Sequence, residues 1–167
     1  MPSMTEVLNH QQIKDRITRI AWQIYEEYHQ QEKVIFVGIA ERGFRLASLI
    51  ADELKAISPL EVALYQLSFD KDNIYQTEFR LSPSIEDLQA GNVVLIDDVL
   101  NSGSTLIHAV RYLLRNDLQN LKTVVMVDRN HKRFPVKADF KGLSLSTSTQ
   151  EHVKVNLEKE PYAVTVS

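Results

Sequence analysis

The sequence predicts an α/β fold, a twisted parallel sheet flanked by helices. Short continuous apolar runs at residues 34–37, 93–96 and 123–127 are typical of strands buried on both faces. Stretches with apolar residues at helical spacing alternate with these runs, and this alternation implies a parallel sheet wound by right-handed crossovers. A chain of 167 residues fits a single domain, 1–167, with one sizeable core.

The first elements follow from periodicity. Residues 9–31 are expected to form a helix, because one stripe of it is apolar: Ile13, Ile17, Ile20, Ala21, Ile24, Tyr25 and Tyr28. Strand 34–37 follows and ends before Gly38. A loop, 39–43, then leads into a second helix carrying Leu46, Leu49, Ile50 and Leu54.

The middle of the chain contains a long irregular segment. Residues 61–67 form a second expected strand, and residues 68–91 are polar, include Pro83 and Gly91, and lack sustained periodicity. We expect a mobile loop with a short hairpin, because loops this long in compact domains often act as lids over active sites. Strand 93–96, a helix carrying Leu106, Val110, Leu113 and Leu114, and strand 123–127 complete the alternation.

The pattern changes after about residue 128. Short apolar pairs lie among charged residues, and only 153–155 and 163–166 have the character of strands. We expect residues of approximately 128–167 to form a small hood over one end of the sheet.

Composition excludes several kinds of protein. Apolar residues make up 44% of the chain, charged residues 25%, and the formal net charge is −3, so a general nucleic-acid binder is not expected, although a local basic face is compatible. The absence of cysteine excludes disulfides and thiolate metal sites. No apolar stretch approaches the roughly 18–20 residues that cross a bilayer, so we expect a cytoplasmic protein without a membrane partner.

The strongest chemical signal is VVLIDDVLNSGST, residues 93–105. The apolar strand is expected to end in Asp97 and Asp98, and small or polar residues then open a helix: Asn101, Ser102, Gly103, Ser104 and Thr105. A helix N-terminus with a close backbone approach at glycine suits a phosphate, while two carboxylates accept hydrogen bonds from hydroxyls. Ribose 5-phosphate, with a phosphate at one end and a vicinal diol at the other, fits that arrangement.

Other interpretations of these residues are open. Paired aspartates after a strand also occur in receiver domains, which would form an acyl phosphate at Asp97 or Asp98, and in metal-dependent phosphotransferases. Ser and Thr before a helix are often plain caps. The turn Ala40-Glu41-Arg42-Gly43 has one cation, one glycine and a following helix, so it is compatible with anion binding and equally with an ordinary surface turn.

Residues 93–105 resemble the phosphoribosyl pyrophosphate (PRPP) motif of type I phosphoribosyltransferases. Within that family the chain is similar to the PyrR group, pyrimidine operon regulators that are also uracil phosphoribosyltransferases. The similarity covers most of the chain and includes ITRIA at 17–21, VGIAERG at 37–43 and VDRNHKRFPVKADFKG at 127–142.

The resemblance implies a role for each motif residue. Asp97 and Asp98 would hold the ribose hydroxyls, Asn101 to Thr105 the 5′-phosphate, and Ala40, Glu41, Arg42 and Gly43 the pyrophosphate. Mg²⁺ would be the cofactor, bound mainly through PRPP itself with no direct protein ligand implied. The expected reaction joins PRPP to a nucleobase, with uracil as the expected base, UMP and pyrophosphate as products, and a homo-oligomer, dimer or larger, as the working form.

The chain departs from the PyrR pattern at several positions. Asn101 replaces a bulky aromatic residue, Ser104 replaces an arginine, and Gln66-Leu67-Ser68 replaces Arg-Asp-Asp at the root of the lid. Arg80 and Lys71 are the candidates to replace the lost lid charge, although the sequence does not place either of them. Purine enzymes of the family carry an Asp where this chain has Asn101, and an amide cannot act as a general base, so a purine substrate is disfavoured. The lost arginines favour an alternative function, a nucleotide-sensing regulator that binds an mRNA leader with weak or no catalysis.

The block 128–142 is open to three uses: a base pocket, an RNA surface, or a solvated face. It follows a strand directly, so it emerges at the same end of the sheet as Asp97, and the expected base-binding residues are Asp128, Arg129, Phe134 and Val136. The residues expected to bind RNA by the resemblance are Thr18, Arg19, Arg133 and Lys137. Trp22 and Leu143 replace basic residues of that pattern, and we expect Trp22 to be a core or dimer contact.

Overall fold

The computed structural model describes residues 3–83, 88 and 90–167, and their main feature is a six-stranded sheet in the order β4-β3-β2-β5-β6-β7. Its strands are β2 (Lys33–Ile39), β3 (Glu61–Ser68), β4 (Arg80–Ser82), β5 (Asn92–Leu100), β6 (Asn120–Asp128) and β7 (Phe140–Ser144). All neighbouring pairs are parallel except β3 with β4, which is antiparallel at one edge. The predicted α/β class with a twisted, mostly parallel sheet is confirmed.

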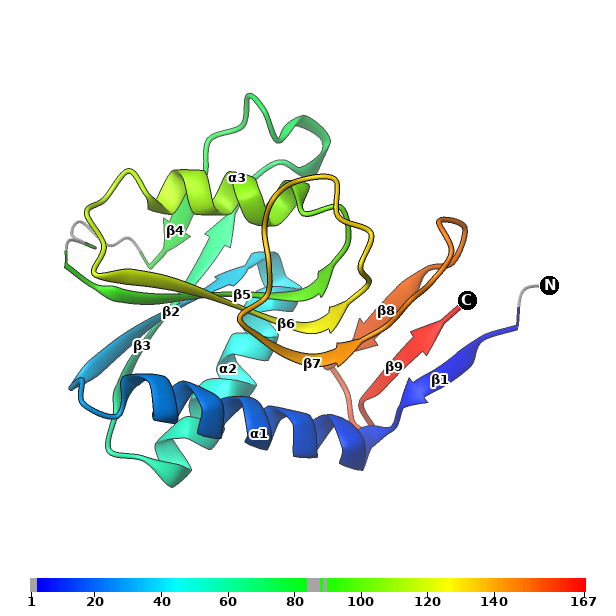
Figure 1. The fold of residues 1–167 in the computed structure, drawn as a ribbon, viewed down its shortest axis with the longest axis horizontal. Coiled ribbons are helices and arrows are strands. Elements are labelled where there is room, and N and C mark those ends of the chain that lie inside the picture. The colour runs from blue at the N-terminus through cyan, green and yellow to red at the C-terminus, as the bar shows by residue number, and fades with distance from the viewer. Residues whose placement is uncertain (1–2, 84–87, 89) are drawn as a thin grey trace.

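Helices cover both faces of this sheet (Figure 1). Helices α1 (His10–Tyr28) and α2 (Ala40–Ile57) pack on one face, and α3 (Ser104–Leu113) packs on the other. The apolar stripe predicted from residue 13 onward is the buried face of α1. Two apolar clusters result, one on each side of the sheet, and this is why the central strands β2 and β5 are buried almost throughout.

A second sheet lies beside the first (Figure 1). It has three antiparallel strands in the order β1-β9-β8, where β1 is Thr5–Leu8, β8 is Val153–Asn156 and β9 is Ala163–Val166. The sequence predicted β8 and β9 but not β1 or β7. The segment expected as a hood, residues 128–167, therefore divides between two sheets. Its first strand, β7, extends the main sheet, and β8 and β9 form the small sheet together with the N-terminal strand β1.

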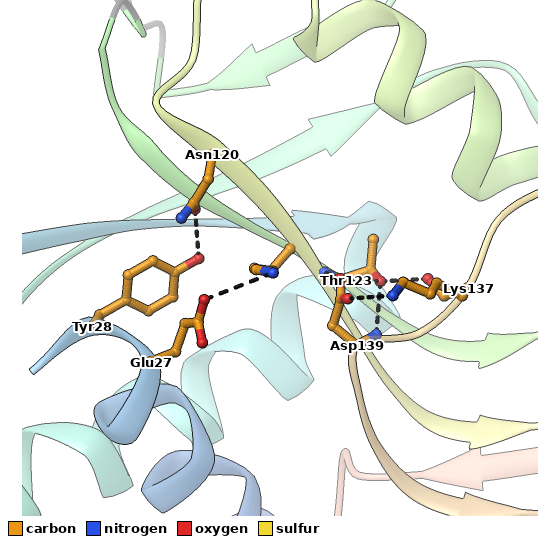
Figure 2. A network of polar contacts seen from close by, with 7 residues as sticks. Glu27, Tyr28, Asn120, Thr123, Lys137 and Asp139 are labelled. Atoms are coloured by element: carbon orange, nitrogen blue, oxygen red, sulfur yellow. Dashed lines mark hydrogen bonds and ion pairs between the residues drawn. The ribbon is translucent and has the colours of Figure 1, made fainter.

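Polar contacts fix the N-terminal half of β6 (Figure 2). Tyr28 at the end of α1 donates to the side chain of Asn120 at 2.8 Å, and the Glu27 carboxylate lies 3.7 Å from Lys122. The Asp139 carboxylate accepts from the backbone N–H of Thr123 at 2.9 Å. These contacts hold α1 and the end of the 128–142 block against the same strand.

Two expected loop boundaries were wrong. Residues 39–43 form no separate loop, because β2 runs to Ile39 and α2 begins at Ala40. The chain reverses at a single residue, Ala40, whose φ of 53° lies in the left-handed region. Strand β5 likewise does not end at the aspartates but continues to Leu100, where it still pairs with Asp128 of β6.

The segment 68–91 contains the short hairpin that was expected, formed by β3 and β4. Its described part rests on α3: the ring of Phe79 stacks on Tyr112, with ring centroids 5.4 Å apart, and Tyr75 meets His108 edge-on at 5.0 Å. Residues 84–87 and 89 of the expected lid lie outside the described residues. No helix in the described part of the chain is both long and apolar enough to cross a bilayer.

Candidate functional site

The main sheet has a point where the chain changes direction. From β2 the chain steps outward to β3 on one side and later returns to β5 on the other, so β2 and β5 are neighbours whose connections leave in opposite directions. In open α/β sheets, ligands bind in the crevice at the carboxyl ends of such a strand pair. The predicted motif residues follow these two strands, and a cleft of about 230 Å³ opens there.

The cleft brings together most of the residues predicted to bind a phosphorylated ribose. It is lined by all seven positions of the predicted ribose phosphate site: Asp97, Asp98, Asn101, Ser102, Gly103, Ser104 and Thr105. Ala40 and Arg42 of the predicted pyrophosphate turn line it as well, whereas Glu41 lines a second, adjoining cleft, which also includes Arg42 and Asp98. The first cleft has residues that the sequence had not assigned to it, among them Lys71 and Val153.

Residues 101–105, predicted to bind the 5′-phosphate and named here the phosphate loop, are shaped by Gly103. This residue is the N-cap of α3 with φ 89°, and no side chain caps the helix. A Cβ on it would lie 2.6 Å from the Val136 side chain, so both conformation and space require glycine. The first N–H groups of a helix lack intrahelical partners, and the positive end of the helix dipole favours an anion there. The start of α3 is therefore suited to a phosphate.

The two aspartates stand next to each other on β5 with different surroundings. Asp98 is 9% exposed, while Asp97 is half-buried and its Oδ1 accepts the Asp98 N–H at 2.8 Å. Burial raises the pKa of Asp97 well above its ordinary value, the neighbouring Asp98 carboxylate raises it further, and Lys71 acts in the opposite direction. Ionised Asp97 is thus held at a cost in free energy, which a ligand that donates hydrogen bonds to it would offset.

The turn predicted to bind pyrophosphate, residues 40–43, lies close against β5 because of a second glycine. A Cβ on Gly43 would lie 2.5 Å from the Ile96 carbonyl oxygen and 3.3 Å from the Asp97 Cα, so a larger residue would push α2 away from β5. At the start of the same helix, Ala40 has a positive φ, a conformation that costs a non-glycine residue about 1–3 kcal/mol and that gathers at functional sites. Strain and close packing therefore coincide where the anion-binding turn was predicted.

The residues predicted to bind the base do not line the cleft. Asp128 is 1% exposed and lies 3.6 Å from both Lys132 and Lys141. Phe134 and Val136 lie against Gly103 on the outside of the phosphate loop. The backbone N–H groups of Arg133 and Phe134 donate to the Ser102 carbonyl at 2.7 and 3.1 Å, so this segment supports the loop from behind.

Two of the predicted RNA-binding residues have partners within the chain. Thr18 donates to Glu53 at 3.0 Å, and Arg19 donates to the carbonyls of Lys141 and Gly142 in the edge strand β7. Arg133 and Lys137 are exposed, and Lys137 lies 3.6 Å from Asp139. Trp22 is 51% exposed, so the expectation of a core role for it was wrong and a dimer contact stays a prediction.

The residues that sequence reasoning missed come from two distant segments. Lys71 reaches the cleft because the β3–β4 hairpin folds back over α3, and Val153 reaches it because β8 lies beside β5. The sequence had offered Lys71, together with Arg80, as a cation of the expected lid that replaces the lost arginine, but without a position, and Val153 had no signal beyond its place in a short strand.

Comparisons with known proteins identify the family to which the chain belongs. The model of the phosphoribosyl transferase domain matches residues 3–160. Relatives named bifunctional protein PyrR include one from Microcystis aeruginosa, 30% identical over 95% of this chain and 93% of its own length. Another, from Oceanobacillus iheyensis, is 31% identical over 96% of this chain and 94% of its own.

Solved structures with the same fold include hypoxanthine phosphoribosyltransferases. A hypoxanthine-guanine enzyme from Bacillus anthracis superposes with a TM-score of 0.78 at 16% identity, covering 99% of both chains. The hypoxanthine enzyme of Trypanosoma cruzi superposes with a TM-score of 0.79 at 16% identity, covering 97% of this chain and 95% of its own. At such low identity these structures bear on the fold alone. Given the matched domain and the PyrR relatives over almost its whole length, the chain belongs to the type I phosphoribosyltransferase family, among the relatives of PyrR.

Proposed function

We propose that this protein transfers the phosphoribosyl group of PRPP to uracil, giving UMP and pyrophosphate. The observation that carries the proposal is the single cleft in which the carboxylates of Asp97 and Asp98, the N-terminus of α3 and the turn at Ala40 meet. Carboxylates that accept from a diol, together with a helix N-terminus that binds a phosphate, match the two ends of a ribose 5-phosphate.

The roles of the side chains follow from their charges. In displacement at the anomeric carbon, the bond to pyrophosphate breaks, the bond to the base nitrogen forms, and the sugar gains oxocarbenium character. Arg42 and Lys71, the cations that line the cleft, would stabilise negative charge on the departing pyrophosphate. Asp97 and Asp98 would hold the ribose hydroxyls and favour positive charge on the ring.

The donor set fits Mg²⁺ that is shared with the substrate. No group of three or more His, Cys, Asp or Glu side chains suited to a metal occurs among the described residues, so the described part has no protein-only cage of that kind. Mg²⁺ takes oxygen ligands and often binds through substrate phosphates, so PRPP itself would supply most of its ligands, next to the carboxylates of Asp97 and Asp98 that hold the ribose hydroxyls. The ion would neutralise charge on the pyrophosphate when bound.

The choice of uracil has two supports. The resemblance to PyrR implies a pyrimidine, and the amide of Asn101 cannot serve as a general base toward a purine. Apolar side chains against which a flat base could lie are present in the cleft lining, among them Val153 of β8 and Val99 of β5, which pack against the same apolar cluster. We infer that Val153 contacts the base, and the 128–142 block would then act on the base indirectly, through the loop that it supports.

The test is turnover with a panel of bases. The protein is incubated with PRPP, Mg²⁺ and uracil, cytosine, hypoxanthine or guanine, and pyrophosphate and nucleotide are measured together. Release of pyrophosphate with equimolar UMP, seen with uracil alone, is expected. Val153→Ala should raise the KM for uracil while leaving the KM for PRPP within a few-fold. PRPP binding without turnover of any base would reject the enzymatic proposal.

A second candidate function is a nucleotide-sensing regulator that binds an mRNA leader. The observation in its favour is the exposure of three cations on one segment, Lys132, Arg133 and Lys137. Phosphate contacts make RNA binding steeply salt-dependent, and UMP should change the affinity if the two sites are coupled. A titration with leader RNA at two salt concentrations, with and without UMP, separates the candidates, and Arg133→Ala with Lys137→Ala serves as the variant pair.

A further inference from the structure

Arg129 is a buried cation that touches the phosphate loop. It follows β6 directly and is 9% exposed. Its guanidinium donates to the Asn101 side-chain oxygen at 2.9 Å, the Thr147 hydroxyl at 2.9 Å, the Ser148 carbonyl at 3.1 Å and the Glu151 carbonyl at 2.7 Å. Three of these four contacts lie in the segment 147–151, and the fourth lies in the candidate site.

None of the four acceptors carries a charge. Among the described residues, no carboxylate lies within ion-pair distance of the Arg129 guanidinium. The exposed Glu151 carboxylate is engaged elsewhere: its Oε1 accepts the Ser148 N–H at 2.7 Å, and its pKa is lowered chiefly by hydrogen bonding to Ser148 and less by Arg129. Burying a cation without a counter-charge costs free energy, and hydrogen bonds to neutral acceptors offset this cost only in part.

The contact decides which way the Asn101 amide points. The oxygen and nitrogen of an amide are often interchangeable in a structure, but arginine can only donate hydrogen bonds. The atom that faces Arg129 must therefore be Oδ1, and the NH₂ group of Asn101 points away from Arg129 and can donate to another acceptor. Asn101 is exposed and lines the cleft, so what it offers a ligand there is a donor.

We propose that Arg129 is a positioning residue that locks Asn101 as a hydrogen-bond donor to the bound ligand, which must present an acceptor atom there. The inference rests on the proposed function. The acceptor is an oxygen, either on the ribose phosphate or on the base. Without the hydrogen bond from Arg129, the Asn101 amide could rotate. Its oxygen would then face the acceptor atom of the ligand part of the time and repel it.

The experiment is a double-mutant cycle on ligand affinity. UMP, PRPP with Mg²⁺ and ribose 5-phosphate are titrated into the parent, Asn101→Ala, Arg129→Gln and the double variant, each checked for folding by thermal unfolding. Asn101→Ala should lose roughly tenfold in affinity, the equivalent of about 1.4 kcal/mol. Arg129→Gln alone should lower the affinity by a similar factor. In the Asn101→Ala background it should lower the affinity little further, because the amide that Arg129 orients is already absent.

A matched control distinguishes orientation of the Asn101 amide by Arg129 from a purely structural role of Arg129 in holding the segment 147–151. Thr147→Val removes a contact of the same length to the same guanidinium without touching Asn101, and it should leave UMP affinity within about twofold. If Arg129→Gln and Thr147→Val lower affinity equally, or if the effects of Arg129→Gln and Asn101→Ala simply add, Arg129 only braces the segment 147–151 and the proposal is overturned. Should Arg129→Gln fail to fold, unchanged affinity in Asn101→Ala alone overturns it.

The three ligands separate the source of the acceptor. A loss with all of them places the acceptor oxygen on the ribose phosphate, and a loss confined to UMP places it on the base. A parent protein that binds none of the ligands rejects the proposed function and the inference with it. A parent that binds them while both variants bind equally well rejects the inference alone.

Discussion

Replacing Asp97 with asparagine should make the unliganded protein more stable and its ligand binding weaker. Burial and the Asp98 carboxylate raise the pKa of Asp97 well above its ordinary value, so above that ordinary value this carboxyl destabilises the folded state relative to the unfolded chain. Asparagine has nearly the same shape and keeps an oxygen for the Asp98 N–H, which lies 2.8 Å away in the parent. The substitution removes the charge and retains the hydrogen bond.

The sign of the pH dependence follows from linkage. A carboxyl whose folded pKa exceeds its unfolded value gives stability that is fully present below the unfolded pKa and is lost as pH rises through the folded one. The stability gain of Asp97→Asn should therefore vanish below about pH 4 and grow as the pH rises through the elevated pKa. Each pKa unit corresponds to about 1.4 kcal/mol, and each kcal/mol raises the melting temperature of a chain this size by roughly 2–4 °C.

The same variant should lose affinity for PRPP. A charge-assisted hydrogen bond to a ribose hydroxyl is worth roughly 1.5–3 kcal/mol, so a loss of about 10- to 150-fold is expected. Thermal unfolding between pH 4 and 8 and calorimetric titration with PRPP are the two assays. A lower melting temperature at neutral pH, or a stability difference that does not change with pH, would refute the reasoning.

Asp128→Asn is the matched control. Asp128 ends the neighbouring strand β6, but its carboxylate is 1% exposed and lies 3.6 Å from two lysine ammonium groups. Removing a charge that has such partners should destabilise the fold at neutral pH. The two substitutions are chemically identical, and we expect opposite signs.

Three further predictions concern single positions. Gly103→Ala should cost about 1–3 kcal/mol in urea unfolding and abolish PRPP binding, because φ is 89° and the new Cβ would lie 2.6 Å from Val136; unchanged unfolding would contradict this. Lys71→Gln should raise the pKa of Asp97 further and move the onset of PRPP binding to higher pH, which a titration series across pH measures; an unmoved onset would place Lys71 outside the site. Trp22→Ser should shift a homo-oligomer toward monomer in sedimentation with little change in melting temperature, since Trp22 is 51% exposed, and an unchanged sedimentation coefficient would remove it from the interface.

Much of the fold was predictable because its central strands are buried on both faces. A short continuous apolar run such as 93–96, followed by polar residues, is characteristic of such a strand, and α1 has a clear stripe from Ile13 to Tyr28. Strands β1 and β7 were missed for physical reasons. β1 begins with two exposed polar residues, Thr5 and Glu6, and its pairing partner β9 lies at the other end of the chain. β7 is an edge strand of mixed character whose strand conformation depends on its pairing with β6.

The residues of the candidate site also divide into those that local sequence could predict and those that it could not. Residues 97–105 were predictable because strand, turn and helix N-terminus are contiguous, so local chemistry already implies a phosphate. Lys71, Val153 and the bond from Arg129 to Asn101 depend on how distant segments fold over that loop. Arg129 also shows the limit of inferring exposure from charge: the basic block suggested a surface, but this side chain is buried and holds neutral acceptors.

We propose that the cleft at the ends of β2 and β5 holds a phosphorylated ribose through Asp97 and Asp98. The most direct measurement is a calorimetric titration of PRPP with Mg²⁺ into the parent and into the double variant Asp97→Asn, Asp98→Asn. The parent should bind one PRPP per chain, and the folded double variant should bind at least about a hundredfold more weakly, since two charge-assisted hydrogen bonds are lost. Equal affinity in parent and folded double variant would contradict the account.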